Sequence, residues 1–116
     1  MTVMIYHNPR CSKSRQALAL ISAAGVKPEV VEYLKTGWTE ALLTGLFFKA
    51  GITAREALRV TQAPAPELGL AKADDATILA AMITHPVLVE RPIVMVGDLA
   101  AICRPPERVH MLLDKA

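Results

Sequence analysis

The sequence has only two cysteines, Cys11 and Cys103, which lie far apart and form no C-x-x-C pair. A disulfide framework and a cysteine-based zinc site are therefore excluded. The three histidines form no H-x-x-x-H or H-E-x-x-H motif, and no G-x-x-x-x-G-K-[ST] phosphate loop occurs. We therefore expect no metal ion and no tightly bound cofactor.

The chain also lacks a strong net charge and a long apolar run. Thirteen Lys and Arg stand against eleven Asp and Glu, which gives a formal net charge of +2. This charge is too small to favour nucleic acid or a membrane surface as a partner. The apolar runs fall far short of the ~18 residues that a membrane span requires. The first residues carry no signal-peptide pattern, so a cytoplasmic location is expected.

Length and composition favour one globular domain. The chain has 116 residues, of which 53% are apolar and 21% charged, enough to bury one hydrophobic core. We expect a single domain over residues 1–116, without repeats or linkers. Its fold class should be α/β, because strand and helix patterns alternate along the chain.

The periodicity predicts a βαβ unit, a helical insertion and a final ββα unit around a mixed four-stranded sheet. The first two strands flank a helix that starts near Ser14, so they should be parallel. The last two are joined by a Gly97-Asp98 turn and should form an antiparallel hairpin. A last helix should start near Pro105. The predicted strands cover residues 2–6, 29–34, 92–97 and 99–103.

The insertion is expected over about residues 38–85. Thr39–Ala50 has helical spacing, and Asp74 is placed to cap another helix that ends at His85. Thr53–Glu56 fits a capping box, which predicts a short helix that includes Arg59. The proline-rich stretch Ala63–Pro66 is predicted to be a loop.

Cys11 is placed by this pattern at the start of the first helix. Helix-start N–H groups lack partners, and the helix dipole adds positive potential there. A thiolate is favoured in that field, so the pKa of Cys11 should lie below the free value of about 8.5. Arg10, Lys13 and Arg15 flank Cys11 in the sequence and should act in the same direction. The alternative interpretation is a small buried cysteine without chemistry.

Residues 8–14 are also typical of an anion-binding turn, with backbone amides and cations at a helix start. They do not form the C-x5-R loop of a phosphatase, because residue 17 is alanine. Ser12 and Ser14 can supply hydroxyl donors. His7 could orient this turn or tune the thiolate, and its alternative interpretation is a polar turn residue. Cys103 lies in a predicted strand and is interpreted as structural.

Three arginines, Arg59, Arg91 and Arg104, are expected at element ends. If the fold brings them to Cys11, their planar guanidinium groups would form a clamp suited to a tetrahedral oxyanion. If it does not, they are ordinary solvated charges. Arg55 and Arg108 are expected on solvated helix faces.

Four ordered segments resemble the glutaredoxin-dependent arsenate reductase family. The run from Tyr6 to Arg15 is similar to the family's active-site pattern, which reads H-N-P-x-C, two residues, then S-R. Segments similar to those that carry the family's substrate arginines are Glu56–Arg59, His85–Val94 and Cys103–Glu107. The resemblance spans essentially the whole chain. It implies a thioredoxin-like fold with a helical insertion, and a cis Pro92 beside the active-site cysteine.

The resemblance also implies a reaction. A thiolate would attack arsenic(V), glutathione would join the adduct, and glutaredoxin would reduce it and release arsenite. Glutathione would be a co-substrate, arsenate and glutaredoxin the other partners, and the protein is expected to be a monomer. The site residues implied are the nucleophile Cys11, its supports His7 and Ser14, and the oxyanion ligands Arg59, Arg91 and Arg104.

Two other functions stay open. A regulatory protein of the Spx type shares this fold and binds RNA polymerase, but such sensors generally use a C-x-x-C pair where this chain has Ser14. A glutathione-dependent reductase of protein mixed disulfides is compatible with Cys11-x-x-Ser14, but it would leave the three arginines without a role.

Overall fold

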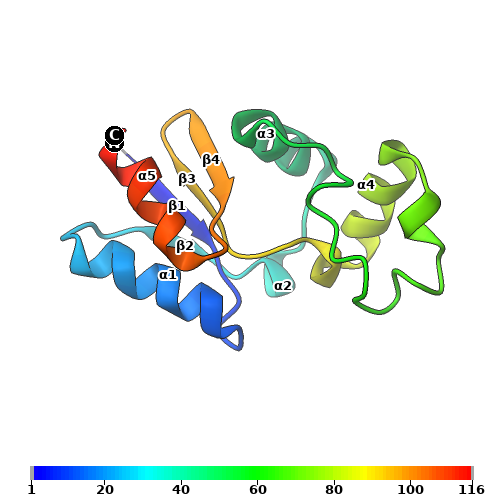
Figure 1. Ribbon diagram of the computed structural model, residues 1–116, viewed down its shortest axis with the longest axis horizontal. Helices are drawn as coiled ribbons and strands as arrows, with labels where there is room; N and C mark the ends of the chain where they lie inside the picture. Colours follow the sequence, from blue (N-terminus) through cyan, green and yellow to red (C-terminus); the bar gives the residue numbers. More distant parts are fainter. Residues whose placement is uncertain (1, 116) are drawn as a thin grey trace. The chain divides into compact units, whose positions relative to one another are not determined.

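The structure, a computed structural model, describes residues 2–115 and contains two compact units (Figure 1). The first unit is built from the chain up to Thr36 and from Arg91 onward, and the second is Gly37–Glu90. The helical insertion expected at residues 38–85 falls within the second unit.

The first unit contains one mixed four-stranded sheet in the order β2-β1-β3-β4. β1 is parallel to β2 and antiparallel to β3, and β3 and β4 form an antiparallel hairpin. Its strands are β1 (Val3–Tyr6), β2 (Glu29–Val31), β3 (Ile93–Val96) and β4 (Leu99–Ile102). The predicted sheet, its parallel first pair and its final hairpin are confirmed.

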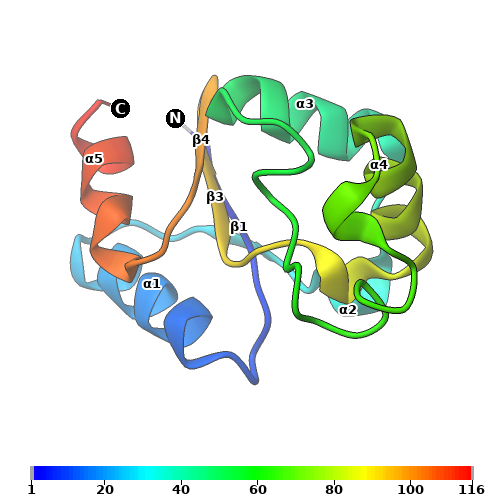
Figure 2. The ribbon, with the colours of Figure 1, turned by 45° about the vertical axis from the view of Figure 1, so that its right-hand side comes forward.

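Two helices, α1 (Ser12–Ala23) and α5 (Val109–Asp114), lie on the same face of this sheet, as both views show (Figures 1 and 2). Alternate residues of a strand point to one face, and Ile5 of β1 pairs with Val94 of β3 with both side chains fully buried. Ala17 and Ile21 of α1 join the same apolar cluster. Burial of this face packs α1 against β1 and β3.

The second unit contains α3 (Glu40–Ala50) and α4 (Asp75–Thr84). Thr39 caps α3 by accepting a hydrogen bond from the N–H of Leu42 at 3.1 Å, and Gly51 ends it in the left-handed conformation, with φ 67°. The Asp74 carboxylate caps α4 by accepting the N–H of Thr77 at 2.8 Å. Both predicted helices are confirmed. Short 3-10 turns occur at Leu70–Lys72, Pro86–Leu88 and Pro106–Arg108.

The second predicted strand is too long. It ends at Val31, and Tyr33–Thr36 form the short helix α2. The carbonyl oxygen of Glu32 accepts the N–H groups of Lys35 and Thr36 at 2.9 and 3.1 Å, which turns the chain away from the sheet. The Tyr33 side chain is buried, so this residue of the predicted strand is buried from a helical turn instead.

The prediction of a short helix that includes Arg59 is wrong. The capping box does form, since Thr53 N–H donates to Glu56 Oε1 at 3.0 Å and Glu56 N–H donates to Thr53 Oγ1 at 3.2 Å. However, Leu58 then forms a β-bridge with Val89, and Arg59 N–H donates to the Leu88 carbonyl oxygen at 2.8 Å. These cross-chain bonds replace the bonds that would continue a helix.

The Arg91-Pro92 peptide bond is cis, as the family resemblance implied. The Ala63-Pro64 and Arg104-Pro105 bonds are also cis, which nothing in the sequence pattern predicted. Among the helices of residues 2–115, none is long and apolar enough to cross a membrane.

Candidate active site

Cys11 is the N-cap residue of α1 and the last residue of a tight turn, residues 7–11, at the end of β1. The turn is held by Asn8, whose backbone oxygen accepts the N–H of Cys11 and whose Oδ1 accepts the N–H of Arg10, each at 3.0 Å. Asn and Pro are typical turn residues, and Pro9 has no N–H to satisfy. Cys11 is largely buried, with 9% of the residue exposed.

The surroundings of Cys11 favour its thiolate. Burial alone would raise its pKa, but the N–H groups of Ser14 and Lys13 and the charge of Arg91 outweigh it. The Arg91 side chain also hydrogen-bonds the sulfur. The net effect is a Cys11 pKa below its ordinary value, so the predicted direction is confirmed.

The cation that lowers the pKa of Cys11 does not come from the residues next to it in the sequence. Arg10, Lys13 and Arg15 were expected to provide the charge, yet the guanidinium that contacts the sulfur comes from Arg91, just before β3. The Arg15 side chain instead donates to the Pro9 carbonyl oxygen at 2.9 Å. Arg15 thus braces the turn.

His7 and Ser14 form a buried pair beneath the turn. His7 Nδ1 lies 2.6 Å from Ser14 Oγ, and their residues are 6% and 0% exposed. The Ser14 Oγ also accepts the N–H of Asn8 at 3.0 Å, so it links His7 to the backbone of the turn. Burial lowers the pKa of His7, with Arg15 acting in the same direction and Glu32 opposing. A neutral His7 therefore anchors Ser14, whose backbone N–H reaches the Cys11 sulfur.

Two of the three predicted arginines belong to the same unit as Cys11. Arg104 Nη1 donates to the Arg91 carbonyl oxygen at 3.1 Å. Next to this bond, the N–H of Cys103 donates to the Pro92 carbonyl oxygen at 2.8 Å. The chain on either side of the β3–β4 hairpin is thereby tied together at the base of the hairpin.

Arg59 belongs to the second unit. Its Nη1 donates to the Val87 carbonyl oxygen at 3.2 Å, and its Nε lies 3.6 Å from Glu90 Oε1. The side chain is 18% exposed, so Arg59 is not an ordinary solvated surface charge.

Cys103 has the opposite environment from Cys11. It lies one residue beyond β4, is fully buried in the apolar cluster, and burial raises its pKa to about 12. Such a thiol stays protonated and inert at neutral pH. Its interpretation as a structural residue is confirmed by this burial.

We expect alkylation to separate the two thiols. Iodoacetamide at neutral pH should label Cys11 within minutes and leave Cys103 unlabelled in the folded protein, because only a thiolate is nucleophilic. Peptide mass mapping before and after unfolding in urea measures this. Equal labelling of both cysteines in the native protein would contradict the assignment.

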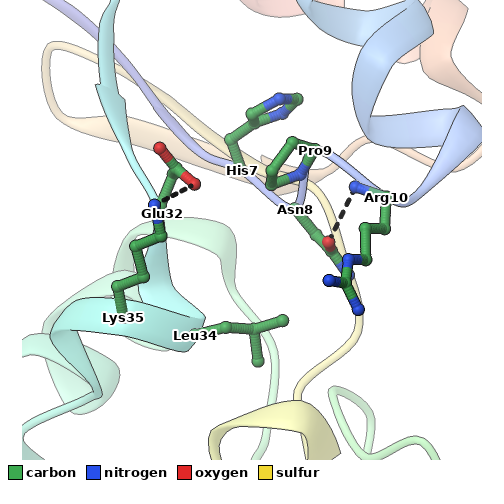
Figure 3. A pocket seen from close by; sticks show the side chains of 7 residues that line it. All are labelled: His7, Asn8, Pro9, Arg10, Glu32, Leu34 and Lys35. Atoms are coloured by element: carbon green, nitrogen blue, oxygen red, sulfur yellow. Dashed lines mark hydrogen bonds and ion pairs between the residues drawn. The ribbon is translucent and has the colours of Figure 1, made fainter.

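A pocket of about 280 Å³ also borders the turn (Figure 3). Residues 7–10 line one side, and Glu32, Leu34 and Lys35 from the junction of β2 and α2 line the other. Sequence reasoning missed these three residues, since it placed Glu32 and Leu34 in a strand and gave Lys35 no role. Within residues 2–115, no three His, Cys, Asp or Glu side chains gather as a metal site requires.

Comparisons with known proteins agree on one family. A model of the ArsC family matches residues 6–112. Arsenate reductase ArsI2 of Synechocystis is 52% identical over 114 residues, covering 97% of this chain and 81% of that protein. An arsenate reductase of Rhizobium meliloti is 46% identical over 115 residues, covering 97% and 82%. The solved structure of an arsenate reductase from Vibrio cholerae superposes with a TM-score of 0.92 at 41% identity, covering 97% and 98%. The expected thioredoxin-like α/β fold is confirmed.

Proposed function

The chain belongs to the ArsC family, and from this we propose that it is an enzyme that reduces arsenate to arsenite with the Cys11 thiolate as nucleophile. The observation that carries the proposal is the contact between Cys11 and Arg91. The helix-start N–H groups and the guanidinium lower the pKa of the thiol, and the same guanidinium suits a tetrahedral oxyanion. Relatives at 46–52% identity that are named arsenate reductases support the same substrate.

In the first step the Cys11 thiolate attacks the arsenic atom of arsenate. A sulfur–arsenic bond forms, and one arsenate oxygen leaves as water after protonation. Arg91 and Arg104 bind the remaining oxygens and stabilise their charge as the bond forms. Arg59 is proposed as a third ligand on the strength of the family resemblance.

Reduction of arsenic(V) to arsenic(III) needs two electrons, which two thiols supply as they become a disulfide. Cys103 cannot be the second thiol partner of Cys11, because it is fully buried and its pKa is raised to about 12. We therefore propose that the thiols of glutathione and glutaredoxin provide the two electrons. The glutathione thiol displaces a second oxygen as water and forms its own sulfur–arsenic bond.

A glutaredoxin thiolate then attacks the glutathione sulfur. A mixed disulfide forms, and the electron pair of the broken sulfur–arsenic bond stays on arsenic, which is now arsenic(III). Water displaces the Cys11 sulfur, which leaves as a thiolate and releases arsenite. The low pKa of Cys11 serves this last step as well, because a more stable thiolate is a better leaving group.

The direct test is NADPH consumption coupled through glutathione, glutaredoxin and glutathione reductase. Consumption should require arsenate and each of the three coupling components. The Cys11-x-x-Ser14 segment also fits a reductase of protein mixed disulfides, so a glutathionylated peptide serves as the second substrate. Turnover of the peptide without turnover of arsenate would replace the proposed function by that one.

The thiolate absorbance of Cys11 should titrate with a midpoint below about pH 8.5, the pKa of a free cysteine. Ultraviolet titration of the Cys103→Ala variant measures Cys11 alone. Arg91→Gln should move the midpoint upward, because loss of the guanidinium removes a charge and a hydrogen bond that favour the anion. A midpoint at or above 8.5 in the Cys103→Ala variant, or no change on Arg91→Gln, would refute the electrostatic account.

A further inference from the structure

The pocket beside the 7–11 turn is lined by charges of both signs. Lys35 Nζ and Glu32 Oε1 lie 3.5 Å apart on one side, with side chains that are 78% and 39% exposed. Arg10 lies on the opposite side, and Leu34 extends into the space between them (Figure 3). Such a lining does not suit a second oxyanion, which Glu32 would repel, nor a simple cation, which Arg10 and Lys35 would repel. It suits a ligand that carries both kinds of charge.

We propose that this pocket binds glutathione, with the γ-glutamyl end between Glu32 and Lys35 and the glycyl carboxylate on Arg10. This rests on the proposed function, which needs glutathione at Cys11. The γ-glutamyl group carries an ammonium and a carboxylate on one carbon atom. These two charges match the Glu32 carboxylate and the Lys35 ammonium, which already stand at ion-pair distance.

The pocket borders the turn that leads to Cys11, and its lining residue Arg10 is the sequence neighbour of Cys11. Arg10 precedes Cys11 directly, so their Cα atoms are about 3.8 Å apart. An extended tripeptide spans roughly 10 Å, long enough to cross from the Glu32 side to the Arg10 side. Its central cysteine then lies along the turn. The volume of about 280 Å³ is just below the roughly 300–1,000 Å³ of small-molecule pockets, which fits a peptide that leaves its thiol outside.

Binding of S-methylglutathione to the Cys11→Ser variant tests the site without any reaction. Calorimetry should give a Kd that rises about 3- to 10-fold when Glu32→Gln or Lys35→Gln is added, between the effects of an exposed ion pair and a charge-assisted hydrogen bond. Lys27→Gln is the matched control, because Lys27 is exposed and lies outside the pocket. It should change the Kd by less than about twofold.

A truncated probe identifies which end of the peptide these residues hold. S-methyl-cysteinylglycine lacks the γ-glutamyl group, so Glu32→Gln and Lys35→Gln should leave its Kd within about twofold. In the active protein, both substitutions should raise the KM for glutathione about 3- to 10-fold and leave the KM for arsenate unchanged. Equal losses for both probes would overturn the proposed orientation.

The outcomes separate this site from the proposed function. Unchanged Kd values in the Glu32 and Lys35 variants, or no binding of S-methylglutathione, would overturn the pocket assignment while arsenate reduction stands. Binding that weakens as expected, in a protein that does not reduce arsenate, would support the pocket and refute the arsenate function.

Discussion

Replacement of Cys11 by Ser should abolish arsenate reduction. A serine hydroxyl is not ionised at neutral pH, so the helix-start amides and Arg91 would have no anion to stabilise and arsenic would meet no nucleophile. Loss of a catalytic nucleophile costs about 10⁶-fold in well-studied enzymes, and we expect kcat/KM to fall by at least about 10⁴-fold. The coupled NADPH assay measures the loss.

Cys103→Ala is the matched control for this substitution. It removes the other thiol, which is fully buried and has its pKa raised to about 12, and should leave turnover nearly intact. A small loss of stability is expected, because the sulfur fills space in the apolar cluster. Residual activity in Cys11→Ser comparable to that of Cys103→Ala would mean that neither cysteine is the nucleophile.

Sequence patterns predicted the elements whose sequence signal is local. Short continuous apolar runs placed β1 and β3, and the caps at Thr39 and Asp74 are formed by the side chains of those residues. The position of Cys11 at the start of α1 follows from the same logic, because strand and helix periodicities meet there. Each of these signals lies within a short stretch of sequence, although β1 and β3 are stabilised by pairing across the chain.

The failures occur where distant parts of the chain decide the outcome. The capping box at Thr53–Glu56 forms, but bonds from Arg59 and Leu58 to the segment near Val89 replace the helix that should follow. Similarly, the positive charge that stabilises the Cys11 thiolate comes from Arg91 and not from the cations that flank Cys11 in the sequence. Sequence spacing carries no information on such through-space contacts.

Arg55 is exposed as expected, but it lies in a turn and not on a helix face. Its Nη1 donates to the Ala71 carbonyl oxygen at 2.7 Å, its Nη2 bonds the Ala73 carbonyl oxygen, and its N–H donates to Asp75 Oδ1 at 3.2 Å. Arg55 therefore ties the loop before α4 to the segment after α3. Its role is structural although the side chain is exposed, which no pattern of apolar residues could indicate.

Arg→Lys substitutions at the proposed oxyanion ligands should each lower kcat/KM for arsenate about 10- to 150-fold. A lysine keeps the charge but lacks the planar fork of two N–H donors, and one charge-assisted hydrogen bond contributes roughly 1.5–3 kcal/mol. Arg91→Lys should show the largest loss, because Arg91 also bonds the Cys11 sulfur. The assay is run above the thiol pKa of every variant, so that the loss reports oxyanion binding. The variants are Arg59→Lys, Arg91→Lys and Arg104→Lys.

Substitutions at two further arginines serve as controls, because they distinguish a loss of oxyanion binding from a loss of stability. Arg108 is exposed, and Arg108→Lys should change kcat/KM by less than about twofold. Arg55→Lys should lower Tm through loss of its bonds to the loop before α4, with kcat/KM of the folded fraction nearly unchanged.

Arg59 is the critical member of the proposed clamp, since Val87 and Glu90 hold it in the second unit. If Arg59→Lys behaves like Arg55→Lys, Arg59 is a structural residue and the clamp consists of Arg91 and Arg104. If all five variants show equal, small losses, the arginines bind no oxyanion, and a thiol reductase becomes the better explanation of the Cys11 thiolate.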